Sequence, residues 1–186
     1  SDMHYLSRYL SPLGGITLAS NGTALTGLWF DGQKYYAANL TDEQTEKDLP
    51  VFAQAREWLA CYFTGHAPDF TPPFDINGTS AFRKKVWELL LEIPFGQVTT
   101  YGTIAAQMQE ATGRRVSAQA VGGAVGHNVL SLINPCHRVI GSDGNITGYA
   151  GGPDKKLALL RLEGVDTSKL IIPKGKSSNE TERAPL

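Results

Sequence analysis

A proline-rich stretch at residues 66–74 divides this chain into two parts with different hydrophobic patterns. Pro68, Pro72 and Pro73 fall within it, and clustered prolines interrupt both helices and sheets. Alternating segments and one helical stripe precede the stretch, whereas only helical patterns follow it. We therefore expect domains at residues 1–74 and 75–173. A polar tail without periodicity, residues 174–186, is expected to be disordered.

The first part has the pattern of a small sheet with one helix. Residues 5–10, 15–20 and 23–30 alternate as strands do, and Asn21-Gly22 predicts a two-residue hairpin. From Pro50 to Gly65 the period becomes helical. The apolar stripe of this helix consists of Val51, Phe52, Ala55, Trp58, Leu59, Tyr62 and Phe63. The expected fold is an α/β domain with a small antiparallel sheet.

The second part has the pattern of a helical domain. A first helix is capped by Thr79 or Ser80 and closed by Pro94 and Gly96. Its apolar stripe consists of Phe82, Val86, Leu89, Leu90 and Ile93. Further helices are expected at about residues 103–109, 117–125 and 153–163, the last with Leu157 and Leu160 inward and Gly164 after it. The turn at residues 112–115 gives the second and third helices the size of a helix-turn-helix. The expected fold is all-α.

The net charge of −1 hides an asymmetry between the two parts. Residues 1–74 carry four Lys/Arg against eight Asp/Glu, which gives −4, and residues 75–186 carry thirteen against ten, which gives +3. A polyanion would bind the C-terminal part, although chance variation explains the charges equally well. Because +3 is small, any DNA contact must depend on shape and a few placed groups.

The two cysteines, Cys61 and Cys136, are far apart and lack CxxC spacing, so no metal site is expected. No apolar run could span a bilayer and no signal peptide opens the chain. We therefore expect a cytoplasmic protein without a membrane partner, and free thiols in preference to the alternative, a disulfide between the two cysteines.

Cys136 lies in the segment Asn134-Pro135-Cys136-His137-Arg138. A thiolate is a strong nucleophile, but a thiol has a pKa of about 8.5 and needs help to ionise. The adjacent His137 and Arg138 are of the types that give such help. The alternative is that Cys136 is only a small buried apolar residue.

The sequence around Cys136 resembles the O6-alkylguanine-DNA alkyltransferase family. The resemblance is carried by Pro-Cys-His-Arg-Val at residues 135–139, Gly-Tyr-Ala-Gly-Gly at 148–152, Ala-Val-Gly-Gly-Ala at 120–124 and Asn128. It spans about residues 82–164. It implies a ribonuclease H-like N-terminal domain and a C-terminal domain that binds DNA through the minor groove, flips the damaged base out and transfers its alkyl group to Cys136.

The resemblance also assigns roles to residues. It implies that Glu163 and His137 activate Cys136 through a water, and that Tyr101 assists the leaving guanine. It places Tyr149 in the base pocket and has Asn128 tie the recognition helix to the active-site strand. The remaining residues expected at the base or DNA are Ala120, Gly122, Gly123, Arg138 and Ala150. Taken singly, Glu163 would be a solvated helix-end residue, the tyrosines core residues, and the Ala/Gly run a site of close helix packing.

Three positions depart from the family pattern. Gln119 stands where many members have an arginine that fills the gap left by the flipped base, and we expect Gln119 to take that role. Val129 stands where proline is usual, and Asn134 where an aliphatic residue is usual. Both lie near the active site, so they bear on rate and substrate range.

The expected function is single-turnover repair of O6-alkylguanine in double-stranded DNA, with O4-alkylthymine as a second candidate substrate. No cofactor or metal is expected, and the protein should be a monomer in a prokaryotic cytoplasm. The alternatives are a non-catalytic alkylated-base binding protein, a helix-turn-helix regulator, and a Cys/His hydrolase or peroxidase. The presence of Cys136 argues against the first, and the small charge against the second.

Overall fold

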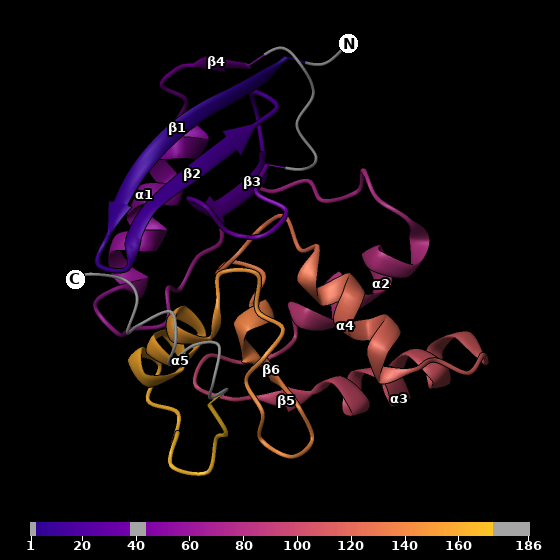
Figure 1. Ribbon diagram of the computed structural model, residues 1–186. Coiled ribbons are helices and arrows are strands. Elements are labelled where there is room, and N and C mark those ends of the chain that lie inside the picture. The colour runs from indigo at the N-terminus through magenta and orange to yellow at the C-terminus, as the bar shows by residue number, and fades with distance from the viewer. Residues whose placement is uncertain (1–2, 38–43, 173–186) are drawn as a thin grey trace.

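The computed structural model describes residues 3–37 and 44–172 (Figure 1). A four-stranded sheet forms the N-terminal part, with the strand order β3-β2-β1-β4. Its strands are β1 (His4–Ser11), β2 (Gly14–Ser20), β3 (Leu25–Phe30) and β4 (Gln44–Glu46). The three long strands pair antiparallel, and the short β4 pairs parallel to β1. The sheet is therefore the small one expected, with one added parallel edge strand.

The predicted two-residue hairpin at Asn21-Gly22 is wrong. Ser20 pairs with Leu25, so the loop between β2 and β3 spans residues 21–24, and the register shifts beside Ser20. The Asn21 side chain explains the longer loop, because its Oδ1 accepts from the backbone N–H groups of Thr23 and Ala24, each at 3.0 Å. An asparagine that bonds to backbone two and three residues later stabilises a wider turn. The two-residue turn lies instead between β1 and β2, where Ser11 pairs with Gly14.

Helix α1 (Pro50–Tyr62) lies along one face of this sheet (Figure 1). Six of the seven predicted stripe residues are buried: Val51, Phe52, Ala55, Trp58, Leu59 and Tyr62. Pro50 occupies the first turn, where its missing N–H costs nothing. Gly65 follows with a φ of 88°, a left-handed conformation that glycine adopts without strain.

The C-terminal part is helical, as expected, with a small strand pair added. Its helices are α2 (Ala81–Leu90), α3 (Tyr101–Thr112), α4 (Ala118–Gly126) and α5 (Pro153–Leu162). Ser80, Thr100 and Ser117 cap the first three, each accepting a backbone N–H with its side chain. The pair consists of β5 (Thr99–Thr100) and β6 (Val139–Ile140), which are parallel. Helix α3 begins two residues before its predicted start, after the Thr100 cap, and ends three residues beyond its predicted end, where Gly113 has a φ of 71°.

Two helices differ in detail from their predicted patterns. Helix α2 ends at Leu90, before Pro94, and its buried face includes Trp87, whose indole N–H donates to the carbonyl of Ala124 over 2.8 Å. In α5 the buried residues are Lys156, Leu159 and Leu160, whereas Leu157 is half-buried. The expected disordered tail lies outside the described residues. Within the described ranges, every helix is too short or too polar to span a membrane.

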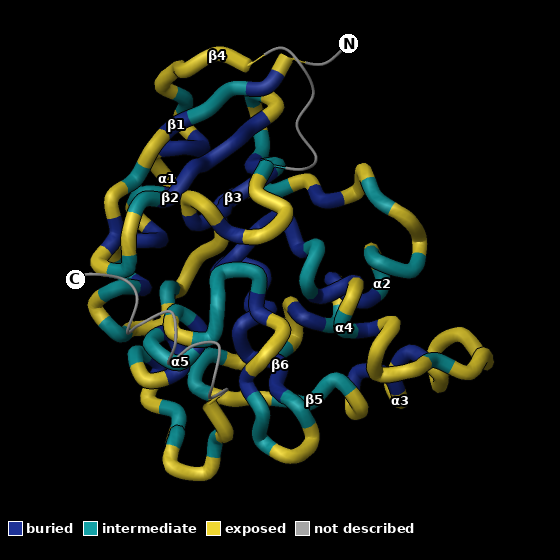
Figure 2. The backbone as a smooth tube through the Cα atoms, in the orientation of Figure 1, coloured by how far each residue is buried: buried dark blue, intermediate teal, exposed yellow. Residues whose placement is uncertain are grey.

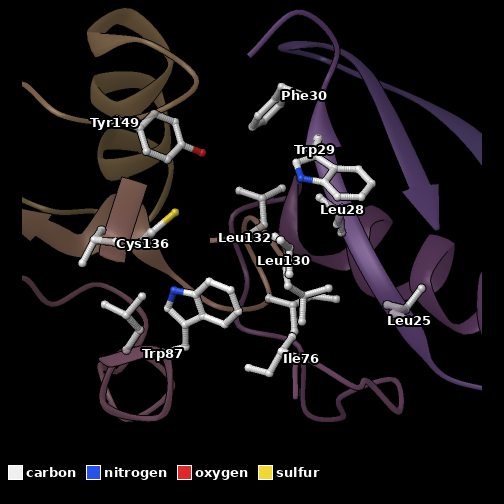
Figure 3. Packing of buried hydrophobic residues seen from close by; sticks show 14 of the residues in the cluster. Leu25, Leu28, Trp29, Phe30, Ile76, Trp87, Leu130, Leu132, Cys136 and Tyr149 are labelled. Atoms are coloured by element: carbon white, nitrogen blue, oxygen red, sulfur yellow. The ribbon is translucent and has the colours of Figure 1, made fainter. Parts of the chain in front are cut away.

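Strand β3 joins the two parts. The N–H of Leu28 donates to the carbonyl of Val129 over 2.8 Å, and the N–H of Ser131 donates to the carbonyl of Leu28 over 2.9 Å. One hydrophobic cluster continues across this junction, from Leu28 and Trp29 to Cys136 (Figure 3). Figure 2 shows the same continuity: buried backbone runs through β2 and β3 and is found again at β6 in the C-terminal part. The segment that leads to Cys136 is thus hydrogen-bonded to β3 at the edge of the sheet. The division into two domains at residue 74 stays a prediction.

Candidate active site

Cys136 opens the short 3-10 helix η1 (Cys136–Arg138). Its N–H donates to the carbonyl of Asn134 over 2.8 Å, and 4% of the residue is exposed. Burial raises the pKa of the thiol, while the Asn128 side chain and the charge of Lys156 lower it. Figure 3 shows Cys136 and Tyr149 facing the same space. This cysteine is neither exposed nor surrounded only by apolar groups.

Asn128 fixes the loop between α4 and Cys136. Its Nδ2 donates to the carbonyl of Asn134 over 2.9 Å, and its Oδ1 accepts the N–H of Leu130 over 3.2 Å. These bonds tie the end of α4 to the segment before Cys136, which is the role the sequence predicted. Asn128 is 4% exposed, so it acts through this tie and not as a surface contact.

His137 and Glu163 form a fully buried pair. The Nε2 of His137 lies 2.6 Å from the Oε2 of Glu163, the residue that caps the C-terminus of α5. Burial lowers the pKa of His137, and Glu163 offsets this only in part. Burial alone would raise the pKa of Glu163, but the hydrogen bonds and charges of His137 and Arg138 lower it to about 2. At neutral pH a carboxylate therefore accepts the Nε2 proton of a neutral imidazole.

This tautomer leaves the Nδ1 of His137 as a proton acceptor. Nδ1 is buried and has no hydrogen-bond partner among the described residues. Its lone pair is therefore free to take a proton from the adjacent Cys136, directly or through a bridging water.

The expectation that Arg138 contacts the base or DNA does not fit its position. Arg138 is 7% exposed. Its Nε and Nη2 donate to the two oxygens of Glu163 at 2.8 and 3.1 Å, and its Nη1 donates to the carbonyl of Ile93 over 2.7 Å. A guanidinium committed to a buried carboxylate is unavailable to a phosphate. Arg138 instead compensates the charge of Glu163.

Lys156, on α5, is a site residue that the sequence analysis missed. It is fully buried, its Nζ donates to the carbonyls of Val139 and Thr147, and the same nitrogen lies 5.7 Å from the centre of the Tyr101 ring. Burial lowers the pKa of Lys156 to about 8, although Cys136 raises it. One feature of the sequence could have identified it. Lys156 shares a helical stripe with Leu159, Leu160 and Glu163, and a lysine is rarely buried on such a stripe unless it has a partner.

Tyr101 and Tyr149 border the space next to Cys136. Tyr101 begins α3 and donates through its hydroxyl to the carbonyl of Thr147 over 3.4 Å. Burial, and then Cys136, raise the pKa of Tyr101 to about 12, so its phenol stays protonated. A Cβ on Gly148 would lie 3.0 Å from this hydroxyl, so glycine allows the close approach. Burial, and then Cys136, raise the pKa of Tyr149 as well.

A pocket of about 370 Å³ opens between α4 and the loop that carries Tyr149. Its lining consists of Lys34, Tyr35, Gly122, Gly123, Gly126, His127, Gly148, Tyr149 and Ala150. The pocket thus brings together four of the predicted base or DNA residues. It also includes a residue pair that sequence reasoning missed: the rings of Tyr35 and His127 stack with centroids 3.7 Å apart. Tyr35 is contributed by the N-terminal part.

Among the residues that the structure describes, none packs closely enough against the glycines of α4 to require them. A Cβ on Gly123 or Gly126 would meet nothing within 4 Å, and one on Gly122 would meet only the Tyr101 ring at 3.9 Å. None of the three has a positive φ, so the backbone does not require glycine either. Close helix packing therefore fails to explain them. Ala120 and Gln119 are also exposed, in the first turn, and this face is free to receive a partner.

The two departures beside the active site fit the fold. Val129 is mostly buried, and its carbonyl accepts from Leu28, a contact that proline could also make. Asn134 is fully buried, and its Nδ2 donates to the Oδ1 of Asn128 over 3.3 Å. Its own Oδ1 is without a hydrogen-bond partner among the described residues. Asn134 therefore adds one buried amide oxygen to the segment that precedes Cys136.

Comparisons with known proteins match both parts of the chain. The model of the 6-O-methylguanine DNA methyltransferase ribonuclease-like domain matches residues 4–76, and that of the same family's DNA binding domain matches residues 81–165. A methylated-DNA–protein-cysteine methyltransferase of Mycobacterium tuberculosis is 42% identical over 153 residues, 82% of this chain and 88% of that protein. One of Haemophilus influenzae is 38% identical over 160 residues, 86% of each.

Solved structures agree with these matches. A crystal structure of Mycobacterium tuberculosis OGT in complex with DNA superposes with a TM-score of 0.75 at 40% sequence identity. The match covers 89% of this chain and 94% of that one. The expected fold, a ribonuclease-like domain followed by a helical domain, is confirmed.

Proposed function

This chain belongs to the 6-O-methylguanine DNA methyltransferase family, and from that premise we propose that it repairs DNA by moving an alkyl group from guanine O6 onto Cys136. The observation that carries the assignment to Cys136 is the buried Glu163–His137 pair, joined at 2.6 Å. It leaves the Nδ1 of His137, the residue that follows Cys136, without a partner among the described residues and able to accept a proton. Such a pair is needed because burial raises the pKa of Cys136.

The first step is removal of the thiol proton. His137 Nδ1 accepts it, directly or through a bridging water, and the imidazolium that forms is stabilised by Glu163. The carboxylate orients the ring and does not take the proton, because its pKa is lowered to about 2. The ammonium of Lys156 lowers the pKa of Cys136 through its charge, which favours the thiolate.

The second step is displacement at the alkyl carbon. A sulfur lone pair forms the new S–C bond while the electrons of the C–O6 bond leave with guanine. The departing base requires a hydrogen bond or a proton. Tyr101 is suited to supply the hydrogen bond, because its phenol remains protonated with a pKa raised to about 12. The guanine leaves as an anion and takes up one proton, and His137 gives up the proton that it took from the thiol, so that overall one proton passes from Cys136 to guanine. The resulting thioether has no acidic proton and is a poor leaving group, so each molecule acts once.

Access to Cys136 requires the base to leave the stack. The thiol is 4% exposed, and a base inside a duplex cannot reach a buried atom. The glycine face of α4 would lie close to the minor groove, with Gln119 filling the gap. The pocket beside Tyr149 and Ala150 is where the flipped base would enter. Arg138 has no part in this contact.

A non-catalytic lesion binder remains the second candidate for a protein with this DNA-facing surface. An intact-mass measurement after incubation with an O6-methylguanine duplex separates the two. Transfer predicts a gain of one CH2 unit, present in Cys61→Ala and absent in Cys136→Ala. Tight binding of the lesion with no mass gain would assign the protein to the binders.

A further inference from the structure

Tyr62, in the last turn of α1, reaches the Glu163–His137 pair from the N-terminal part of the chain. It is fully buried, and its hydroxyl donates to the Oε2 of Glu163 over 2.6 Å. The hydroxyl oxygen of Tyr62 also lies 3.3 Å from the Nε2 of His137. Burial, and then Glu163, raise the pKa of this phenol, so the hydroxyl is a donor at every working pH.

The Tyr62 ring is held on several sides. It stacks on Trp58 with centroids 5.3 Å apart and an interplanar angle of 8°. It also meets Phe95 edge-on at 6.0 Å and His137 at 6.3 Å. A ring fixed in this way directs its hydroxyl at one point. The position of the donor is therefore set by the packing between the two parts of the chain.

Four described residues donate hydrogen bonds to Glu163, and Tyr62 is the one among them that comes from the N-terminal part. Oε1 accepts the N–H of Gly96 and the Nε of Arg138, both at 2.8 Å. Oε2 accepts from Tyr62 and His137 at 2.6 Å and from the Nη2 of Arg138 at 3.1 Å. A carboxylate offers about four lone-pair positions, so these five donors compete. Each one weakens the carboxylate as an acceptor for the others.

We propose that Tyr62 is a positioning residue for alkyl transfer, whose hydroxyl holds the Oε2 of Glu163 against His137 and limits the pull of that oxygen on the imidazole proton. This inference rests on the function proposed above and gives the N-terminal part a role in the chemistry. The charged and titratable groups around His137 are Glu163 and Arg138 at its Nε2 side and Lys156 on α5. Cys136 precedes it in the chain, and the ring of Tyr149 lies 6.4 Å from that of His137 between centroids.

Removing the hydroxyl has a defined consequence. Without the bond from Tyr62, Oε2 becomes a stronger acceptor for the His137 N–H, which stabilises the imidazolium and raises the pKa of His137. The neutral base is then lost at a higher pH. The wild-type hydroxyl thus keeps His137 available as a base under mildly acidic conditions.

The experiment is a pH profile of the single-turnover transfer rate for the full chain, with an O6-methylguanine duplex as substrate. Tyr62→Phe is expected to slow transfer about tenfold, comparable to the loss of one charge-assisted hydrogen bond. Its acid limb is expected to move to higher pH, with lesion-DNA affinity unchanged. Tyr9→Phe is the matched control, because it removes a phenol hydroxyl from β1, in the same N-terminal part, that is not among the donors to Glu163.

Three results would overturn the inference: a Tyr62→Phe profile that superposes on wild type, an equal slowing in Tyr9→Phe, or an equal loss of DNA affinity. Replacing Tyr62 with p-aminophenylalanine keeps a donor at the same place and should restore most of the rate. If Tyr62→Phe fails to fold, this weaker donor still tests the inference, since it should shift the acid limb by a smaller amount. Absence of transfer in the wild type would instead contradict the proposed function.

Discussion

His137 Nε2 and Glu163 Oε2 lie 2.6 Å apart, and both side chains are completely buried. The two residues come from η1 and from the end of α5. A contact this short fixes the imidazole tautomer and directs Nδ1 away from the carboxylate. The same contact has consequences for stability, charge and catalysis that can be measured separately.

Acid should destabilise this protein through Glu163. The pKa of Glu163 is lowered from 4.5 to about 2 in the folded state, so its contribution is fully present above pH 4.5 and is lost as the pH falls toward 2. The lowered pKa of His137 acts in the same direction, below its usual value of 6.5. The expected loss from Glu163 is on the order of 3 kcal/mol. Denaturant unfolding at a series of pH values measures it.

Glu163→Gln is the control for this acid effect, because an amide does not titrate. The variant should be less stable at neutral pH, since Arg138 loses its buried partner, but its free energy of unfolding should vary less between pH 4.5 and 2. An unchanged pH dependence would assign the acid effect to other carboxyl groups.

Lys156→Met should slow alkyl transfer about tenfold, because loss of the charge raises the pKa of the Cys136 thiol and leaves less thiolate. Methionine keeps the length of the buried chain but removes the charge that lowers the pKa of Cys136. Thiolate ultraviolet absorbance against pH, in a Cys61→Ala background, reads the thiol directly. Lys155→Met, one residue earlier on α5, is the matched control. Equal thiol titration in the two variants would remove Lys156 from the chemistry.

Gly123→Leu should weaken lesion-DNA binding by about tenfold or more without reducing stability. A Cβ at this position meets nothing within 4 Å, and leucine is a better helix former than glycine. Ala60→Leu, at an exposed position of α1, controls for an added surface leucine. Binding isotherms and thermal melts of both variants check the prediction. Unchanged DNA affinity would mean that the glycine face of α4 is not the DNA contact.

Gln119→Ala should reduce both lesion affinity and transfer rate, because the side chain that fills the gap is removed. Gln119 is exposed in the first turn of α4, where a glutamine can hydrogen-bond to the orphaned base. Gln119→Arg supplies the side chain usual in the family, and its charge should raise affinity. Equal values for all three side chains would leave Gln119 without a role in base extrusion.

The sequence predicted the elements well where periodicity was regular. Six of the seven stripe residues of α1 are buried as expected, and Ser80 is one of the two caps predicted for α2, because local patterns determine them. The hairpin at Asn21-Gly22 was wrong because the Asn21 side chain bonds to its own loop. Such competition between side chain and backbone is not visible in a dipeptide signal.

The site was predictable to the extent that a motif contains it. Cys136, His137 and Glu163 came from the resemblance, and their geometry supports the roles assigned to them. The base or DNA contact predicted for Arg138 was wrong, because adjacency to Cys136 in the sequence does not determine the direction of the side chain. Tyr62 was recognised only as one apolar stripe residue among several, since its contact with Glu163 joins positions 101 residues apart.

We propose that Cys136 accepts one alkyl group and is then consumed. The most direct test incubates the protein with an excess of duplex carrying a deuterated O6-methylguanine and quantifies label by peptide mass over time. Transfer to a single cysteine predicts a plateau at one label per chain, all of it on the Cys136 peptide and none on the Cys61 peptide. Label that continues to rise beyond one per chain, or that appears on any other residue, would contradict it.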